Sequence, residues 1–368
     1  MSSGRKIRIV FLHRMKTLKI LLVLLLWGAS PTRAGQPLPA DEAREADAGG
    51  LKNAFSAFTV RLSGTVRAKF EYQPDIGKGR FEVRNARFSL TGNVSPTVNY
   101  KAEIDLSDEG SIKMLDAYMR LNMLRKSLQF TIGQMRVPFT IDAHRSPHEQ
   151  YFANRSFIAK QAGNVRDVGA TLSWSFGREI PVVLEGGIFN GSGLTNQKDF
   201  WTGTFNYSAK AQATFARRVN LTLSFQKTHP DIVNIRMYDA GAYYEDERWH
   251  IEAEYLRKNY VQNAFQGVNV VDAFICRDFR MKHILTKISA LARYDYMSDH
   301  SNGIAGSDGR LFTNDAARHR VTGGFTFSLG LPFTADIRLN YEAYFYRETV
   351  VPALSEQDKL VVEFMCRF

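Results

Sequence analysis

Five basic residues stand in one segment of the chain, residues 135–166, where together they could attract and order anions. They are Arg136, Arg145, Arg155, Lys160 and Arg166, set against two acids, Asp142 and Glu149, so the segment carries a net charge of +3. Two histidines, His144 and His148, would add charge at lower pH. The planar fork of arginine matches phosphate and carboxylate groups, and basic rings at a narrow point favour anions.

The same segment is predicted to fold. It is 32 residues long, and a connection longer than about 12–15 residues is usually functional or disordered. Its apolar side chains could pack against a wall; they are Phe139, Ile141, Tyr151, Phe152, Phe157 and Ile158. Ser146 followed by Pro147, with Glu149 three positions after the serine, predicts a capped helix over residues 147–155. A folded segment of this kind could enter an enclosed space and narrow it.

The elements that position this segment are predicted to be strands, because apolar and polar side chains alternate over most of the remaining chain. Successive side chains of a strand point to opposite faces. One face of the segment 58–72 is apolar, whereas the other carries Arg67, and the same polar parity holds Lys101 and Arg120 on later strands. We expect these three cations on the wall of an interior, with Glu103, Asp105 and Asp116 beside them.

The alternation predicts sixteen strands. They are placed near 58–72, 80–92, 97–107, 112–123, 126–134, 167–176, 181–190, 203–216, 218–228, 235–245, 248–258, 269–279, 283–297, 319–329, 333–346 and 357–368. Their lengths exceed the usual five or six residues of a globular sheet and suit tilted membrane-crossing strands, which need about 9–11 residues.

The connections between these strands alternate between short and long. Those after even-numbered strands are short, and those after odd-numbered strands are longer, except the short one at 107–111. Short inner turns, longer outer loops and an even strand count are typical of a bacterial transmembrane β-barrel. The expected fold class is therefore all-β: a transmembrane antiparallel barrel of about sixteen strands with a long, inward-folded third loop. An exported soluble β-sandwich is the alternative that alternation alone leaves open.

The polar rows favour a water-filled interior. Charges of both signs would make a dry core costly, and about 16–18 strands enclose an aqueous channel. We therefore expect passive diffusion of small hydrophilic solutes with a preference for anions. The alternative is a barrel plugged by its third loop, which would serve as an anchor or binding protein.

The first 34 residues predict a secretory signal peptide. A basic lead precedes the uncharged run 20–27, and Ala34 is a suitable cleavage position, with either Met1 or Met15 as the start. Residues 35–57 would form a periplasmic leader and residues 58–368 the barrel. Removal of 1–34, with seven basic residues and no acid, lowers the formal charge from +11 to about +4, so the charge gives no argument for nucleic acid as a partner.

Several short motifs resemble the phosphate-selective porin family, that of porins O and P. They are Arg84 to Gly92 (RNARFSLTG), Gly133-Gln134 followed by Val137-Pro138-Phe139, Phe189-Asn190-Gly191, and the terminal Phe368. The resemblance implies a homotrimer of sixteen-stranded barrels in a Gram-negative outer membrane, with an arginine-rich pore for anions such as phosphate. The expected partners are outer-membrane lipid and small anionic or polar solutes.

The chain shows no nucleophile elbow, phosphate-binding loop or metal-binding motif, so we expect no enzyme activity, cofactor or metal.

The alternation in the last predicted strand, 357–368, also indicates which side chains face outward and which face the pore. Val362, Phe364 and Cys366 should meet lipid or a neighbouring subunit, whereas Glu363 and Arg367 should meet water in the pore.

Overall fold

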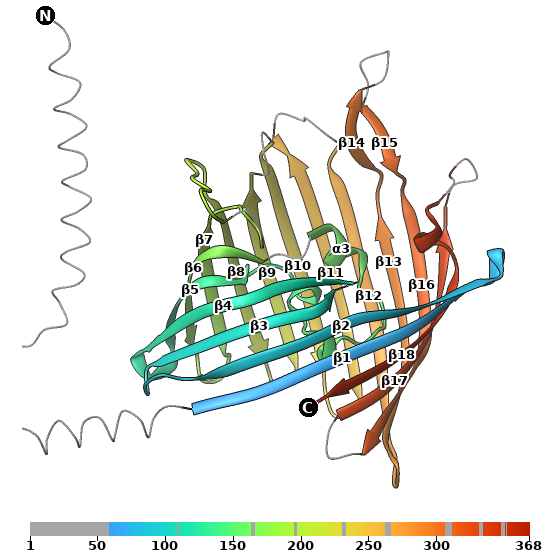
Figure 1. Cartoon of the computed structure of the whole chain (residues 1–368), viewed down its shortest axis with the longest axis horizontal. Coiled ribbons are helices and arrows are strands. Elements are labelled where there is room, and N and C mark those ends of the chain that lie inside the picture. The colour runs from blue at the N-terminus through green and yellow to red at the C-terminus, as the bar shows by residue number, and fades with distance from the viewer. Residues whose placement is uncertain are drawn as a thin grey trace, which may run out of the picture. The chain divides into compact units, whose positions relative to one another are not determined.

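A computed structural model shows sixteen antiparallel strands closed into a barrel (Figure 1). It describes residues 59–368 except 109, 163–165, 195–196, 230–232, 262–265, 306–310, 331–333, 347–349 and 351. The barrel strands are β1 (Thr59–Gln73), β2 (Lys78–Asn93), β3 (Val98–Asp108), β4 (Ser111–Met123), β5 (Leu128–Arg136), β6 (Arg166–Phe176), β7 (Val182–Phe189), β8 (Asn206–Phe215), β9 (Val219–Thr228), β10 (Ile235–Glu245), β11 (Trp249–Tyr260), β12 (Val268–Arg280), β13 (Leu285–Met297), β16 (Arg318–Gly330), β17 (Thr334–Phe345) and β18 (Lys359–Arg367). The predicted fold class is confirmed. The predicted signal peptide and leader lie outside the described residues.

The ring closes where the first strand meets the last. β1 pairs with β18 from Thr65 opposite Arg367 to Tyr72 opposite Leu360. Beyond β18, Phe368 exchanges two backbone hydrogen bonds with Gly64, of 2.9 and 3.1 Å. Its ring lies over Gly64, where a Cβ atom would come within 2.3 Å of it. Glycine at position 64 therefore makes room for the terminal aromatic ring.

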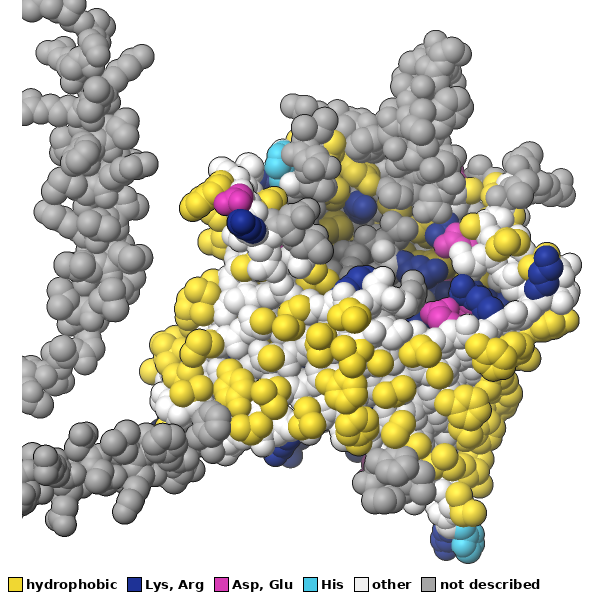
Figure 2. Space-filling model, in the orientation of Figure 1, with side chains coloured by type: hydrophobic (Ala, Val, Ile, Leu, Met, Phe, Trp, Pro, Cys, Tyr) yellow, Lys and Arg dark blue, Asp and Glu magenta, His cyan; other side chains and the backbone are white. Residues whose placement is uncertain are grey.

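The two faces of each strand separate as the alternation predicts. On β1, Val60 and Leu62 are more than half exposed on the outside, whereas Arg67 and Lys69 are buried on the inside. Figure 2 shows hydrophobic side chains covering the visible outer wall and basic side chains gathered within the mouth. No helix in the described part of the chain is long and apolar enough to cross a membrane.

Glu363 departs from its predicted surroundings. It was expected to meet pore water, but its side chain is fully buried between Arg67 and Arg338, at 2.5 and 2.7 Å. The burial arises because the connection between β5 and β6, which we call loop L3 (residues 137–165), lies against this part of the inner wall. Arg67 binds both Glu363 and the Ala153 carbonyl oxygen of L3.

The predicted helix over 147–155 is wrong in extent and place. Only a single 3-10 turn, Pro147–Glu149, forms there, and the capping box between Ser146 and Glu149 is present. The chain is extended again at Gln150 (φ −70°, ψ 134°). An α-helix, α3 (Phe157–Ala162), follows instead. A short hairpin of β14 (His300–Ala305) and β15 (Leu311–Asp315), which was not predicted, extends the loop between β13 and β16.

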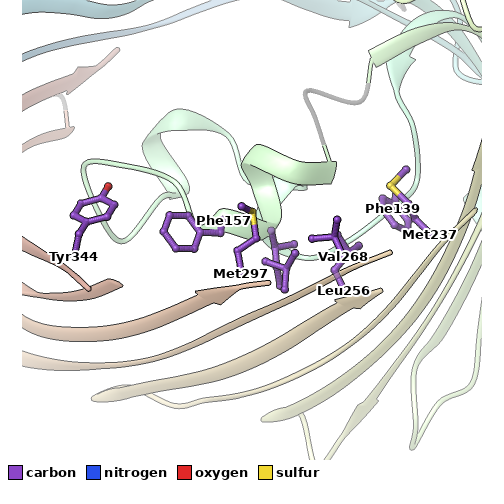
Figure 3. Close-up of a cluster of buried hydrophobic side chains, with 9 residues drawn as sticks. Phe139, Phe157, Met237, Leu256, Val268, Met297 and Tyr344 are labelled. Atoms are coloured by element: carbon purple, nitrogen blue, oxygen red, sulfur yellow. The ribbon is translucent and has the colours of Figure 1, made fainter. Parts of the chain in front are cut away.

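An apolar cluster inside the barrel holds L3 against the wall (Figure 3). The loop contributes Phe139, Phe157 and Ile158, all fully buried. The wall contributes inward side chains of β10 to β13 and β17, which are Met237, Leu256, Val268, Val270, Met297 and Tyr344. Burial of a large apolar side chain is worth about 1.5–3 kcal/mol, so this cluster makes L3 a packed element that occupies one side of the lumen.

Candidate pore constriction

Side chains of the inner wall anchor the backbone of L3 at several points between residues 140 and 157. Glu254 accepts hydrogen bonds from the amides of Ile141 and Asp142, and Lys210 donates to the Thr140 carbonyl oxygen at 2.5 Å. Farther along, the Phe157 amide donates to Asp295 at 3.0 Å. The anchors come from β8, β11 and β13, so L3 is tied to strands far from its own ends.

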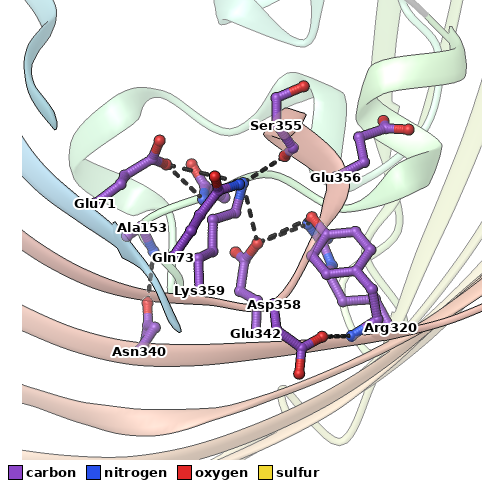
Figure 4. Close-up of polar contacts among 12 residues, drawn as sticks. Glu71, Gln73, Ala153, Arg320, Asn340, Glu342, Ser355, Glu356, Asp358 and Lys359 are labelled. Atoms are coloured by element: carbon purple, nitrogen blue, oxygen red, sulfur yellow. Dashed lines mark hydrogen bonds and ion pairs between the residues drawn. The ribbon is translucent and has the colours of Figure 1, made fainter. Parts of the chain in front are cut away.

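A second set of anchors lies beneath residues 150–155. The Ala153 amide donates to the Asn340 side chain at 2.9 Å (Figure 4). Arg67 donates to the Gln150 side chain at 2.6 Å, and Arg320 donates to the Arg155 carbonyl oxygen at 2.8 Å. Backbone groups that water would otherwise satisfy are thus paired with the wall.

Lys359 sits in the same region, between two acids of neighbouring strands (Figure 4). Its ammonium lies 4.0 Å from Glu71 and 3.9 Å from Glu342, and it donates to the Ser355 carbonyl oxygen at 2.6 Å. The acids of β1, β17 and β18 in this region are therefore engaged by wall cations.

Arg145 of L3 is bound to the wall. Its guanidinium forms a two-armed ion pair with Glu252 of β11 and lies 5.2 Å from the Tyr151 ring centroid. Burial alone would lower the pKa of Arg145, but the nearby carboxylate of Glu252 outweighs burial, so the pKa of Arg145 is raised above its ordinary value. The charge of Arg145 is compensated by this carboxylate.

Arg166 and Lys101 are compensated as well. Both contact Asp116, at 2.7 Å each, and both also lie within 3.3 Å of Glu103. Lys160 lies on α3 with a partly exposed ammonium 3.7 Å from Glu356, near the outer end of the barrel. Each of these three cations has an acidic partner.

Arg136 and Arg155 differ from the others. Arg136 donates to the His144 carbonyl oxygen, and Arg155 donates to the carbonyl oxygens of Asp142 and Arg145 at 3.4 and 3.3 Å. Among the residues that the structure describes, neither guanidinium has a carboxylate within 4 Å. Burial lowers the pKa of Arg155, and the charges of Arg136, Arg87 and Arg67 add to that lowering, although Asp142 opposes it. An anion beside these arginines would relieve this repulsion.

Arg87 belongs to this cationic group, although the sequence pattern does not distinguish it from other inward cations. It is buried on β2, opposite Asp105, which it binds at 2.8 Å. The sequence predicts that Arg87 faces the interior, because it has inward parity on a predicted strand. The sequence does not predict that Arg87 lies near L3, because that depends on how the loop folds.

His144 and His148 do not gain their predicted positive charge in the pH range that is usual for histidine. Burial, reinforced by the nearby charge of Lys210, lowers the pKa of His144 to about 3, and its Nε2 atom lies 2.6 Å from the Val137 carbonyl oxygen. Burial also lowers the pKa of His148. His144 is thus a neutral, structural side chain near neutral pH.

A polar cavity lies at the periplasmic ends of β1 to β5. It measures about 610 Å³, and four cations line it, Arg61, Lys101, Arg120 and Lys126. None of its lining residues in the described part of the chain is acidic. Arg120 donates a hydrogen bond to the Thr131 hydroxyl at 3.0 Å. The centre of its guanidinium lies 5.3 Å from the centroid of the Tyr118 ring. The lining therefore makes this a basic cavity.

The closed sixteen-stranded barrel, its inward loop and its charged lumen define a porin of the outer membrane, a passive channel. Residues 60–231 match the model of the family "Phosphate-selective porin O and P", so the resemblance found in the sequence motifs is confirmed. A search of curated protein sequences finds no match to this chain.

Solved structures show the same fold at low sequence identity. The anion-selective porin from Comamonas acidovorans superposes with a TM-score of 0.57 at 10% identity, over 84% of this chain and 99% of that chain. The outer membrane channel DcaP of Acinetobacter baumannii gives 0.55 at 14% identity, over 85% and 97%. OmpT of Vibrio cholerae in its trimer form gives 0.53 at 10% identity, over 85% and 99%.

Proposed function

We propose that this porin favours small hydrophilic anions, and that Arg136 at the end of β5 and Arg155 of L3 form its selective constriction together with Arg87 of β2. The supporting observation is that Arg136 and Arg155 have no carboxylate partner among the described residues, whereas Arg145 and Arg166 do. A basic group at a narrow point concentrates anions and repels cations.

Phosphate is the anion that we propose as the preferred solute. The family model that matches residues 60–231 is described as phosphate-selective, and guanidinium forks suit tetrahedral oxyanions. The neighbour from Comamonas acidovorans is described as anion-selective. The basic cavity lined by Arg61, Lys101, Arg120 and Lys126 would receive the solute after the constriction.

The test is the reversal potential of single channels in a salt gradient. The double variant Arg136→Gln with Arg155→Gln should lower the anion-to-cation permeability ratio at least threefold. Arg280→Gln is the matched control, because Arg280 is an exposed cation paired with Glu247 at a periplasmic turn. An unchanged ratio in the double variant would remove both arginines from the constriction.

Phosphate preference needs its own measurement. Phosphate added at millimolar concentration should block chloride current in the native channel and block it less in the double variant. Equal block in both channels would leave anion selection in place but reject these arginines as the phosphate contacts.

We also propose that three copies assemble in the membrane, in line with the trimer form reported for OmpT. Cross-linking of the protein in outer-membrane vesicles would show a three-copy band. A product that stops at two copies would contradict this assembly.

A further inference from the structure

Three basic side chains stand on the outer, lipid-facing side of neighbouring strands. Lys227 of β9 lies directly opposite Arg236 of β10. On β11, Arg257 lies opposite Tyr238, two residues after Arg236 on β10. Arg236 and Arg257 are therefore diagonal neighbours across this strand pair, and such neighbours are about 7–8 Å apart. The three cations thus form one cluster.

The strand directions place this cluster near the outer rim. β8 and β9 are joined by a short turn at residues 215–219, and short turns lie on the periplasmic side of such barrels. Lys227, near the end of β9, and Arg236, near the start of β10, are therefore at the opposite end. They face the outer leaflet of the membrane.

The cluster has no acidic counterpart within the described residues. Lys227 lies 5.1 Å from the centroid of the Tyr207 ring, and Arg257 donates to the side-chain oxygens of Asn259 and Asn269, at 2.8 Å each. Arg236 is exposed. Like charges directly opposite on paired strands destabilise a sheet. The unfavourable pair of Lys227 and Arg236 would be relieved by an anion that bridges them.

An apolar groove of about 800 Å³ lies beside the cluster, on the outer face of β6 to β9. Small residues, Gly186, Ala209 and Ala211, form its floor. Larger side chains flank them, namely Leu172, Trp174, Leu184, Ile188, Leu223 and Phe225. Ile188, Tyr207 and Lys227 occupy one register row, so the groove begins next to the cations.

We propose that this face binds a phosphorylated, multi-acylated lipid of the outer leaflet. Its phosphates would contact Lys227, Arg236 and Arg257, and an acyl chain would lie in the groove floored by Ala209 and Ala211. A free phosphate would use only the cations and leave the groove without a role. A second copy of the chain would have to bring acids to a surface whose described part offers cations and apolar groups.

The experiment measures lipid retained by the purified, folded protein. Native mass spectrometry with diphosphoryl lipid A should show that Lys227→Gln with Arg236→Gln and Arg257→Gln weakens retention at least tenfold. The control is Arg277→Gln, which removes an exposed outward cation at the periplasmic end of β12, over the Trp249 ring. That control should retain the lipid as the native protein does.

Two further arms separate the alternatives. In the first arm, the native protein should bind dephosphorylated lipid A weakly, as the triple variant binds intact lipid A. In the second arm, the variant Ala209→Phe with Ala211→Phe keeps the three cations but fills the groove, and it should bind lipid A more weakly than the native protein. Displacement of the lipid by millimolar inorganic phosphate would overturn the lipid site in favour of a free-anion site. A triple variant that changes oligomeric state but keeps its lipid would overturn it in favour of a contact between copies.

A heat-modifiability gel confirms that each variant is folded. If the triple variant does not fold, the single variant Arg236→Gln replaces it, because Arg236 is exposed and has no described partner whose loss would destabilise the sheet. Unchanged retention in that folded single variant would also count against the proposal.

Discussion

Arg145 shows how one side chain of loop L3 acts as an anchor. Its guanidinium compensates Glu252, whose side chain is fully buried. Removing one member of a buried ion pair leaves an uncompensated charge and costs about 3–5 kcal/mol. Among the described residues, the Arg155 guanidinium makes two long hydrogen bonds, both to carbonyl oxygens, so its removal should disturb the loop much less.

Arg145→Ala should therefore release L3 from β11. We expect proteolysis within residues 140–160 to accelerate at least tenfold in membranes, together with larger single-channel current noise. Arg155→Ala is the matched comparison and should leave the proteolysis rate near that of the native protein. Equal rates in the two variants would show that the pair with Glu252 does not hold the loop.

His144 should make loop docking sensitive to acid. Its pKa is about 3 in the docked loop against an ordinary value of 6.5, chiefly because it is buried. The docked state therefore favours neutral histidine. As pH falls below 6.5, a released loop gains a proton that the docked loop refuses, so docking weakens progressively until pH approaches 3.

The corresponding variant is His144→Gln, which keeps a donor for the Val137 carbonyl oxygen but does not titrate. Between pH 7 and pH 4.5, current noise should rise several-fold in the native channel and less in the variant. The same rise in both would place the acid sensitivity elsewhere, for example on the acids that anchor L3.

At the scale of elements, α3 depends on tertiary contacts. A six-residue helix is too short to be stable alone, and this one begins at Phe157, which is fully buried beneath Arg320, 4.5 Å from its ring centroid. The helix is therefore held by its first aromatic side chain.

Phe157→Ala should detach this end of the loop. Truncating a buried phenylalanine costs about 3–5 kcal/mol, and the expected result is a more frequent switching between conductance levels, with a barrel that still shows normal heat modifiability. Phe325→Ala removes the same side chain from the lipid face, where Phe325 is 48% exposed, and should leave conductance unchanged. Switching in both variants would argue against docking as the cause.

The strands could be predicted because each carries its own signal. A period of two in hydrophobicity persists over ten or more residues, and it reflects a lipid face and a lumen face that every barrel strand shares. The apolar inward residues at the outer ends of β10 to β13, such as Leu256 and Val270, break that rule. They do so because L3 covers them, which depends on packing between distant segments.

The helix was misplaced for a related reason. The capping box of Ser146 and Glu149 formed as its motif predicts, but Arg67 and Asn340 then hold Gln150 and Ala153 in an extended course. Both partners lie more than 80 residues away in sequence. The division of the loop arginines into paired and unpaired ones has the same origin, since Glu252 lies 107 residues from Arg145.

For the whole molecule, the contacts of Phe368 lie at the point where the ring closes. Phe368 is bonded to Gly64 by two backbone hydrogen bonds, and its ring lies 6.0 Å from the Phe88 ring in an edge-on arrangement. Phe368→Ala should therefore lower the heat-modifiable, folded fraction several-fold in outer-membrane extracts. Phe364→Ala, on the lipid face of the same terminal strand, should fold normally. Intact assembly of both variants would show that the terminal ring is dispensable.

The anchoring of L3 also has a mechanical consequence. The wall of the barrel is a single sheet of sixteen strands. The loop joins β8 through Lys210, β13 through Asp295 and β1 through Arg67, so it ties together strands that lie far apart around the ring. Squeezing the barrel would therefore strain the loop itself, and the width of the channel should resist membrane tension more than that of a barrel whose loops all lie outside.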